Sequence, residues 1–403
     1  MSGVGSTEPP GAEVAALPAP ERRRGAGLEE LLPQVAEIAA DVRARGDAAL
    51  LDWSERLDGE RPQQLRVPAE TLAAARFEPD VLASVRALAA AVTEVVLAQR
   101  PPDSSVEAVP GIVTERRWLP LASVGVYVPG GRASYPSSLV MAVAPARAAG
   151  VGRIAVVTPR PAEATLAAAR ELGVDEVYAV GGAQAVAALA YGTETIPRVD
   201  KIVGPGNRWV TAAKLLVSGS VAIDLPAGPS EVLVLADETA NPARCAAGLL
   251  AQAEHGPDSE AILLGLDPGL TAAVRELVRD ADNVLVEDVV SLDDALARSE
   301  EYAPEHLELW LADAEAVAGR VRNAGTVFVR TSAVVGDYAA GATHVLPTGG
   351  LARGAGGLGL ESFLKPVQRV TASLAGLERA REIGLPLARA EGLPAHAAAL
   401  EAS

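Results

Sequence analysis

The chain has 403 residues and only four histidines, and each histidine stands near an acid or an amide in the sequence. The four pairs are Gln252 with His255, Glu305 with His306, Asp337 with His344, and Glu391 with His396. Any one of these histidines could lie on the surface or have its hydrogen bonds satisfied in the core. Because so scarce a residue recurs beside polar partners, the set indicates a functional site.

The segment LLAQAEHGPDSE, residues 249–260, ends an Ala-rich helical pattern with polar groups and a turn. Polar side chains at such a place are costly to bury unless something binds them. We expect Gln252 and His255, three residues apart, to project from one helical face and reach one ion. Imidazole and oxygen ligands suit zinc, and Asp337 with either His344 or His396 would complete the set. A neutral glutamine ligand fits a metal that also accepts and releases a substrate.

Glu305 and His306 are adjacent at the start of an expected strand, directly after Pro304. Proline makes the preceding turn rigid, which suits the mounting of an acid–base pair. Histidine is the side chain whose ordinary pKa lies closest to neutral pH. The alternative is an exposed acid beside an ordinary strand histidine.

Short β-branched runs alternate with Ala-rich helical segments from residue 124 onward, which predicts parallel α/β layers. The expected strands are VGVYVPG, RIAVVTP, EVYAVGG, DKIVGPG, EVLVLAD, AILLGL, NVLVED, LELWLAD and TVFVR. We expect ligand sites beyond the carboxyl ends of these strands. Helices are predicted over 28–57, near 79–98, and again after Gly359. GAGGLG at 354–359 has no strand before it, so we predict a mobile loop and not a dinucleotide fingerprint.

The composition limits the classes of partner. Asp and Glu outnumber Lys and Arg by 52 to 35, and the resulting net charge of −17 disfavours nucleic acid and anionic membranes. Cys245 is the single cysteine, so no intrachain disulfide can form. No apolar segment follows Arg22–Arg24, and no run approaches the roughly 20 apolar residues of a membrane span. We therefore expect a soluble cytoplasmic protein.

Eight blocks of the chain, in order, resemble the histidinol dehydrogenase family. The similarity runs from about Gly46 to His396. The blocks are VGVYVPGG, YAVGGAQAVAALAYGT, KIVGPGNRWVTAAK, IDLPAGPSEVLVLAD, AQAEHGPDS, YAPEHLEL, GDYAAGATHVLPT and EGLPAH. Eight ordered blocks are far more specific than any single motif.

The resemblance implies two α/β domains with incomplete Rossmann-like parallel sheets, one inserted in the other, with small helical N- and C-terminal parts. We expect a mobile tail over 1–26 and a first domain over 27–126 and 232–358, with the zinc and catalytic residues. The inserted domain, 127–231, would lie on the NAD side. A helical tail, 359–403, would reach the partner subunit of an intertwined homodimer.

The resemblance also assigns roles to single residues. The implied zinc ligands are Gln252, His255, Asp337 and, reaching across to the partner's site, His396. Glu305 and His306 match the catalytic pair, and Tyr127, Gln184 and Asn207 match positions that touch NAD. The implied substrate contacts are Ser230, His306, His344 and Glu391, together with the four zinc ligands.

The implied reaction is the four-electron oxidation of L-histidinol, through L-histidinal, to L-histidine, the last step of histidine biosynthesis. His306 would take protons in both halves while two NAD molecules accept hydride in turn. Glu305 would activate water for the second half. Cys245 raises a thiohemiacetal route, but it lies inside an Ala-rich helix and is expected to be inert packing.

The chain departs from the family pattern at three places: Thr343 in place of asparagine, a shortened segment at 157–163, and the Gly-rich segment at 354–359. The first and third lie on the substrate side and leave another substrate open, and a hypothesis of a different class stands beside it. One alternative is a zinc-dependent paralogue that oxidises another small alcohol, such as a sulfonated diol. The other is a non-catalytic, zinc-stabilised dimer used for binding or regulation. Ser230 and the tail with Glu391 and His396 favour histidinol, and the intact Glu305–His306 pair favours catalysis.

Overall fold

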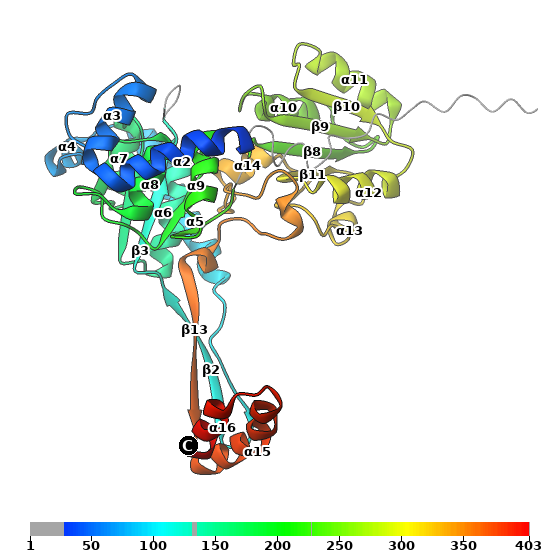
Figure 1. The fold of residues 1–403 in the computed structure, drawn as a ribbon. Helices are drawn as coiled ribbons and strands as arrows, with labels where there is room; N and C mark the ends of the chain where they lie inside the picture. The colour runs from blue at the N-terminus through cyan, green and yellow to red at the C-terminus, as the bar shows by residue number, and fades with distance from the viewer. Residues whose placement is uncertain (1–27, 131–134, 227, 403) are drawn as a thin grey trace, which may run out of the picture. The chain divides into compact units, whose positions relative to one another are not determined.

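The computed structural model describes residues 28–130, 135–226 and 228–402, which form two compact units (Figure 1). Unit 1 contains the described residues of 28–31, 228–335 and 346–357. Unit 2 contains those of 32–226, 336–345 and 358–402. The tail predicted over 1–26 lies outside the described residues.

Unit 1 is built on a five-stranded parallel sheet with the order β10-β9-β8-β11-β12. Its strands are β8 (Glu231–Ala236), β9 (Glu260–Gly265), β10 (Val284–Asp288), β11 (His306–Trp310) and β12 (Thr326–Val329). The helices around it are α10 (Pro242–Ala253), α11 (Pro268–Val278), α12 (Leu292–Tyr302) and α13 (Ala314–Ala318). All six residues of β8 are buried, because alternate side chains enter two separate cores on the two faces of the sheet.

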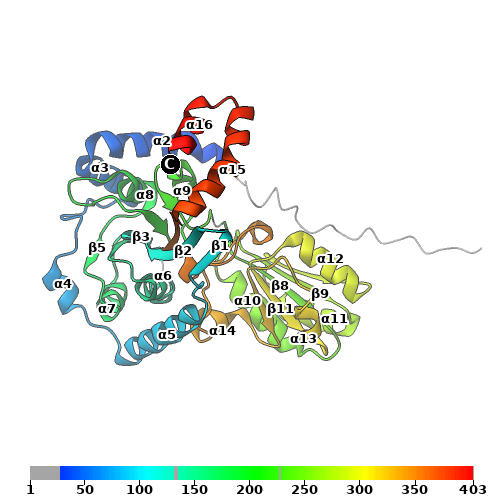
Figure 2. The ribbon, with the colours of Figure 1, turned by 90° about the horizontal axis from the view of Figure 1, so that it is seen from below.

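Unit 2 contains a second parallel sheet with the order β5-β4-β3-β6-β7. Its strands are β3 (Ser123–Tyr127), β4 (Arg153–Val157), β5 (Glu176–Tyr178), β6 (Lys201–Val203) and β7 (Ala222–Ile223). Figure 2 shows α6 (Pro136–Ala149) and α7 (Glu163–Glu171) on one face, and α8 (Gly182–Tyr191) and α9 (Arg208–Val217) on the other. The predicted strands and the α/β class with two parallel sheets are confirmed.

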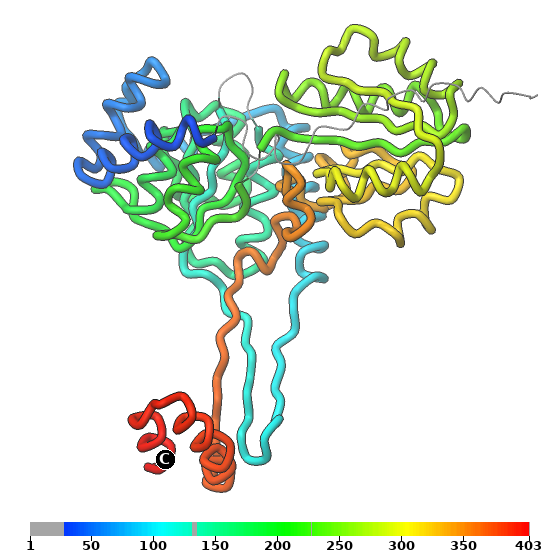
Figure 3. The backbone as a smooth tube through the Cα atoms, turned by 45° about the vertical axis from the view of Figure 1, so that its right-hand side comes forward, coloured from blue at the N-terminus to red at the C-terminus, as the bar shows by residue number. Residues whose placement is uncertain are grey.

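An antiparallel sheet with the order β1-β2-β13 also belongs to unit 2. It consists of β1 (Ser104–Val109), β2 (Ile112–Pro120) and β13 (Leu364–Ala372). Figure 3 shows β2 and β13 side by side along their length, with α15 (Leu374–Ala390) and α16 (Pro394–Ala402) following where β13 finishes. The prediction that 359–403 is wholly helical is therefore wrong. Only Leu364 of β13 is buried, so this strand has no alternating apolar pattern to reveal it.

The helix predicted over 28–57 is also interrupted. It forms α2 (Leu28–Arg45) and α3 (Asp47–Asp58), separated at Gly46, whose φ of 57° is left-handed. A short helix, α4 (Ala69–Ala74), follows, and α5 (Pro79–Ala98) confirms the next predicted helix. The remaining short elements are α14 (Ala333–Tyr338), η1 (Leu351–Arg353) and η2 (Leu360–Phe363). GAGGLG lies between η1 and η2 as a loop, as predicted.

The compact units divide the chain differently from the predicted domains. Residues 32–126, which we assigned to the catalytic domain, lie in unit 2. The reason is that apolar residues of α5, such as Leu82 and Val92, enter the same core as α6 and α7. The predicted boundary at 127 also divides β3, and the terminal segment 359–402 belongs to unit 2 as well.

Within the part of the chain that the structure describes, one helix is long and apolar enough to cross a membrane, Pro79–Ala98. Its buried residues are Leu82, Val85, Leu88, Val92 and Val96, which recur at helical intervals. They pack into the core of unit 2, and Arg86 on the same helix pairs with Glu171. These features are those of a core helix in a globular domain.

Candidate functional site

The predicted catalytic pair lies at the amino ends of two neighbouring strands in unit 1. His306 opens β11 and pairs in register with Val232 of β8, which places Glu305 beside the Ser230–Glu231 junction. The chain reaches this point through a tight turn in which Ala303 has a left-handed φ of 51°. A non-glycine residue in that conformation is strained, and such strain is held where the surrounding structure requires it.

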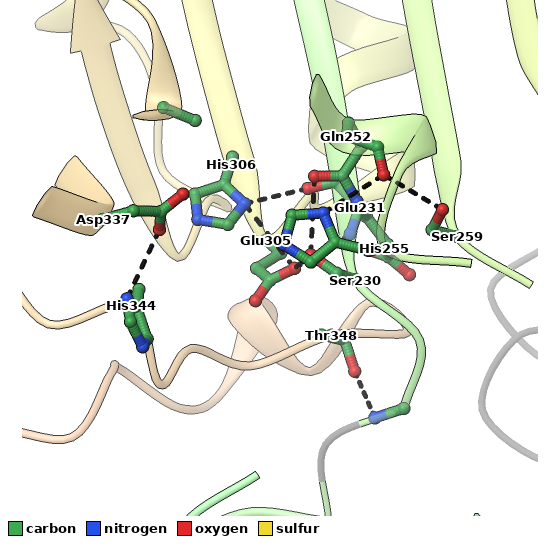
Figure 4. A network of polar contacts seen from close by, with 12 residues as sticks. Ser230, Glu231, Gln252, His255, Ser259, Glu305, His306, Asp337, His344 and Thr348 are labelled. Atoms are coloured by element: carbon green, nitrogen blue, oxygen red, sulfur yellow. Dashed lines mark hydrogen bonds and ion pairs between the residues drawn. The ribbon is translucent and has the colours of Figure 1, made fainter. Parts of the chain in front are cut away.

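The expectation of ligand sites at the carboxyl ends of strands is therefore wrong for this pair. A helix that follows a parallel strand runs back along the sheet, so its last turn returns to the amino ends. Gln252, in the last turn of α10, is brought to the side of Ser230 in this way. Figure 4 shows Ser230, Gln252, Glu305 and His306 gathered there from α10 and the starts of β8 and β11.

Glu305 is held by hydrogen bonds to one of its carboxylate oxygens. Oε2 accepts from the Ser230 hydroxyl at 2.6 Å and from the Glu231 main-chain N–H at 2.8 Å. Glu305 is only 5% exposed, so these donors act with little competition from water. The pair of bonds fixes the carboxylate orientation next to His306, whose Nδ1 lies 3.5 Å from the same oxygen.

His306 is held in one tautomer. Its Nδ1 lies 3.1 Å from the main-chain oxygen of Glu231. A carbonyl oxygen only accepts, so Nδ1 carries the proton and Nε2 is the basic nitrogen of the neutral ring. His306 is 5% exposed, and its ring packs on Phe328 with centroids 5.8 Å apart. A buried imidazole oriented through Nδ1 is suited to take a proton at Nε2.

Gln252 and His255 are adjacent, but in a different way from the one predicted. The helix α10 ends at Ala253, so His255 is an exposed residue of the following turn and not part of the helical face. Its Nδ1 lies 3.2 Å from the Gln252 main-chain oxygen, which again leaves Nε2 as the ligating nitrogen. Metal-binding histidines commonly donate their second N–H to a backbone carbonyl in this manner.

The Gln252 amide also fits a ligand role. Gln252 is 5% exposed, and among the described residues its Nε2 has no hydrogen-bond partner. Oε1 lies 3.5 Å from the Ser230 hydroxyl. Rotating the amide by half a turn exchanges the two atoms, so one of them lacks a partner in either orientation. Such a group is costly to bury unless something binds it.

The other predicted ligands lie in unit 2. His344 Nδ1 is 3.5 Å from a carboxylate oxygen of Asp337, which is on α14. Glu391 is the exposed C-cap of α15, and His396 is exposed on α16. The predicted metal set is thus divided between the units. In the described part of the chain, no group of three or more His, Cys, Asp or Glu side chains is arranged to hold a metal.

The three predicted NAD contacts follow the carboxyl ends of strands in unit 2, as expected for a nucleotide site. Tyr127 ends β3, and its hydroxyl accepts from the Gly182 N–H at 3.1 Å. Burial raises the pKa of Tyr127 to about 12, so the phenol stays protonated. Gln184 is buried in the first turn of α8. Asn207 caps α9 by accepting from the N–H groups of Trp209 and Val210.

A buried ion pair supports the loop before Asn207. Lys214 and Asp224 pair with side chains 3% and 2% exposed. Lys214 Nζ donates to the main-chain oxygen of Gly204 at 3.1 Å. The main-chain N–H of Gly204 donates to Asp224 Oδ2 at 2.7 Å. Gly204 has a φ of 112°, and a Cβ there would lie 2.2 Å from the main-chain oxygen of Tyr127. The pair thus holds both main-chain groups of the glycine between β6 and α9.

Replacing Lys214→Met should lower the free energy of unfolding by about 3–5 kcal/mol, because it leaves the Asp224 charge buried without its partner. The matched control is Arg86→Met, which removes the ion pair between Arg86, 56% exposed, and Glu171. An exposed pair contributes about 0–1 kcal/mol. Urea unfolding of both variants measures the difference. Equal losses in the two variants would show that the buried pair has no special role.

The sequence analysis missed two buried acids at this site. Glu231 orients both catalytic residues through its main chain, and its Oε1 accepts from the Gly349 N–H at 2.8 Å. Glu308 is fully buried on β11 and accepts from Trp310 Nε1 at 2.8 Å and the Ala333 N–H at 2.7 Å. Burial raises the pKa of Glu308. Both are acids inside apolar strands, a signal that the sequence did carry.

Cys245 lies in the core between α10 and the sheet and is fully buried. Burial, with Glu308 nearby, raises the pKa of the Cys245 thiol to about 12. A nucleophilic cysteine reacts as its thiolate, which this setting disfavours. The structure therefore supports packing and not a thiohemiacetal role.

Comparisons with known proteins match almost the whole chain to one family. A family model described as histidinol dehydrogenase matches residues 21–403. The histidinol dehydrogenase of Methanosarcina barkeri is 42% identical, covering 94% of this chain and 93% of its own length. That of Thermobifida fusca is 44% identical over 96% of this chain and 94% of its own.

A solved structure agrees. The crystal structure of histidinol dehydrogenase from Elizabethkingia anophelis matches with a TM-score of 0.87 and 33% identity, over 94% of this chain and 95% of that one. The fold and the sequence thus match the same family along almost the full length. The chain belongs to the histidinol dehydrogenase family of oxidoreductases.

Proposed function

We propose that this protein oxidises L-histidinol, through L-histidinal, to L-histidine with NAD, the last step of histidine biosynthesis. The observation that carries the proposal is the buried Glu305–His306 pair, in which both side chains are oriented by the Glu231 main chain. The family relatives bear the same name over nearly their whole length. The pair also argues against a purely structural zinc dimer, which would need no oriented base.

His306 is the proposed base for the hydroxyl proton of the alcohol. Its Nε2 is the basic nitrogen, and the proton gained there places a positive charge close to the Glu305 carboxylate, 3.5 Å from Nδ1. That carboxylate stabilises the imidazolium. His306 acts again when the hydrated aldehyde loses its proton. Glu305 takes the proton of the water that adds to the aldehyde, and the Ser230 and Glu231 donors keep it oriented.

NAD, when bound, would accept hydride, and we propose that Tyr127, Gln184 and Asn207 hold it. The amide nitrogen of Gln184 lies 3.5 Å from a carboxylate oxygen of Asp58. In the described part of the structure, the buried Oε1 of Gln184 has no hydrogen-bond partner. A buried amide with an unused acceptor fits a ligand with hydrogen-bond donors. Ser230, His344 and Glu391 are the proposed substrate contacts beside the metal ligands.

Zinc, when bound, would orient the substrate through its imidazole and amine nitrogens. The proposed ligands are Gln252, His255, Asp337 and His396, one zinc ion for each subunit. The Gln252 amide fits this role because it is buried with one atom unpartnered among the described residues, and His255 fits because its Nδ1 contact with the Gln252 main-chain oxygen leaves Nε2 available. The fourth ligand, His396, is proposed to act in the site of the partner subunit.

Chelation should abolish activity, and added zinc should restore it, with about one zinc bound per chain. Removal of zinc should also lower the thermal unfolding temperature of the intact dimer, which gives a measurement besides turnover. Elemental analysis of the protein before and after chelation measures occupancy directly. Full turnover by a verified metal-free preparation would refute the role of the metal.

We propose a homodimer with shared active sites. Apolar side chains are exposed on β13 and α15: Val370 at 62%, Leu374 at 83%, Ile383 at 54% and Leu387 at 59%. Exposed apolar groups clustered on one segment mark an interaction surface. A second copy of the chain would cover them and receive His396. The small-molecule substrate, the absence of nucleic acid and membrane partners, and a cytoplasmic location remain predictions from composition and family.

The decisive test of the activity is NADH production with L-histidinol, measured against a panel of small amino alcohols and diols. Turnover with L-histidinol well above the panel supports the proposal. Preference for a different alcohol, such as a sulfonated diol, would favour the paralogue. Thr343 is one of the departures that suggested this paralogue. Its hydroxyl accepts a hydrogen bond from the Val345 N–H, so the residue has a structural role of its own.

A further inference from the structure

A buried acid lies on the apolar face of the unit 1 sheet, two residues after the proposed base. His306 and Glu308 are alternate residues of β11, so their side chains point to the same face of the sheet. In the register with β8 they stand beside Val232 and Val234, which enter the core under α10. Glu308 is fully buried there. A carboxylate at such a place is costly, so it needs a specific set of partners.

The groups that meet the Glu308 carboxylate are neutral donors from two different elements. Oε1 accepts from the Ala333 N–H at 2.7 Å, and Oε2 accepts from Trp310 Nε1 at 2.8 Å. Burial raises the pKa of Glu308, and the hydrogen bonds from Trp310, Ala333 and Ser332 oppose the rise. Both oxygens are therefore used as acceptors, which a carboxylate provides and an amide of the same shape does not.

The first of these contacts fixes the start of α14. Ala333 is the first residue of this helix, and Ser332 before it accepts from the Val334 N–H at 3.3 Å. Asp337, a proposed zinc ligand, lies four residues after Ala333. Residues four apart lie on the same side of a helix, one turn from each other. The bond from Ala333 to Glu308 thus sets where the helix begins and how the side that carries Asp337 is turned.

The second helix, α10, passes directly over the same carboxylate. A Cβ on Gly248 of α10 would lie 3.2 Å from Oε2 and 3.3 Å from Oε1 of Glu308. Glycine is unfavourable inside a helix, but here it lets the backbone come close to the acid. Gln252, another proposed zinc ligand, lies four residues after Gly248. Glu308 therefore contacts each of two helices one turn before a proposed ligand.

We propose that Glu308 is a positioning residue for the metal site, which fixes α10 and α14 against β11 and so sets the places of Gln252 and Asp337. The inference rests on the zinc site of the proposed function. Glu308 acts through Gly248 and Ala333, and it touches neither the ion nor the substrate. Loss of a partner that orients metal ligands typically lowers metal affinity by about 10–100-fold.

The test is the zinc affinity of the full-length protein, measured by competition with a coloured chelator. Glu308→Gln keeps the shape of the side chain but turns its NH₂ group toward one of the two donors, so zinc affinity should fall by about 10–100-fold. Trp310→Phe removes the indole donor. In the double variant the glutamine oxygen can accept from Ala333 with no donor opposed to its nitrogen, and most of the lost affinity should return. A role in folding alone would not produce this rescue.

Two further variants keep the test independent of the folding of Glu308→Gln. Gly248→Ala retains the acid and adds a methyl group against it, so zinc binding should weaken as well. Glu287→Gln is the matched control, because Glu287 pairs with Arg298 of α12 and their side chains are 12% and 13% exposed. The helix α12 carries none of the proposed zinc ligands. Glu287→Gln should therefore lower stability and leave zinc affinity unchanged.

Hydrogen exchange of the metal-free protein supplies a measurement that needs no zinc. Residues 333–338 should exchange faster in Glu308→Gln than in the wild type, because the Ala333 N–H loses its charged acceptor. If the wild type binds zinc and both Glu308→Gln and Gly248→Ala bind it equally well, the positioning role is wrong and the proposed function stands. If the wild type binds no zinc, the proposed metal site fails, and this inference fails with it.

Discussion

Glu305→Gln is expected to slow aldehyde oxidation by about 10²–10⁴-fold while oxidation of the alcohol stays measurable. The amide keeps the shape of the side chain and can still accept from Ser230 and from the Glu231 N–H. It cannot take the proton of a water. Only the second half of the reaction adds water, so the loss should fall on that half. Supplying L-histidinol and L-histidinal separately, in single-turnover experiments, measures the two halves.

His306→Asn is the matched comparison. One base serves both halves, so both should slow by a similar factor. The asparagine side chain can still donate toward the Glu231 oxygen, which receives Nδ1–H in the wild type. The contrast between the variants, and not either loss alone, tests the assignment. Equal slowing of both halves by Glu305→Gln would show that the division of labour proposed here is wrong.

The parallel sheets were predictable because their strands are buried on both faces. A run such as EVLVLA, whose six residues are all buried, is typical of a parallel strand covered on both faces. The strand β13 was not predictable for the opposite reason: LKPVQRVTA exposes eight of its nine residues. Its pairing partner, β2, lies far away in sequence, so only the folded chain reveals the ribbon.

The site residues followed from residue type and family blocks, but their geometry did not. The register between β8 and β11 places Glu231 beside His306. The contact that fixes Nδ1 of His306 depends on this register. No local pattern encodes that register. The same applies to Asp58, which reaches Gln184 across 126 positions of sequence. Tertiary contacts of this kind are set by the packing of whole elements.

Mixing two inactive variants should restore activity if the site is shared. His396→Ala and His306→Ala should each be inactive as homodimers, since one removes a proposed metal ligand and the other the base. His396→Ala removes an exposed side chain of α16, and His306→Ala removes one buried ring and its contact with Phe328 at a strand end, which is a local loss. Both variants are therefore expected to fold, which circular dichroism of each homodimer checks.

In a mixed dimer, the first site takes His306 from one parent and His396 from the other and is whole, while the second carries both lesions. Random refolding of equal amounts makes half the dimers mixed, so about a quarter of the wild-type activity should return under two-fold symmetry. His306→Ala mixed with Glu305→Gln is the matched control. Those two positions lie side by side on one chain, so each site of that dimer keeps a lesion and full turnover should not return. If His396→Ala and His306→Ala form mixed dimers that stay inactive, each tail serves its own chain. The exposed apolar residues of β13 and α15 would then need another explanation.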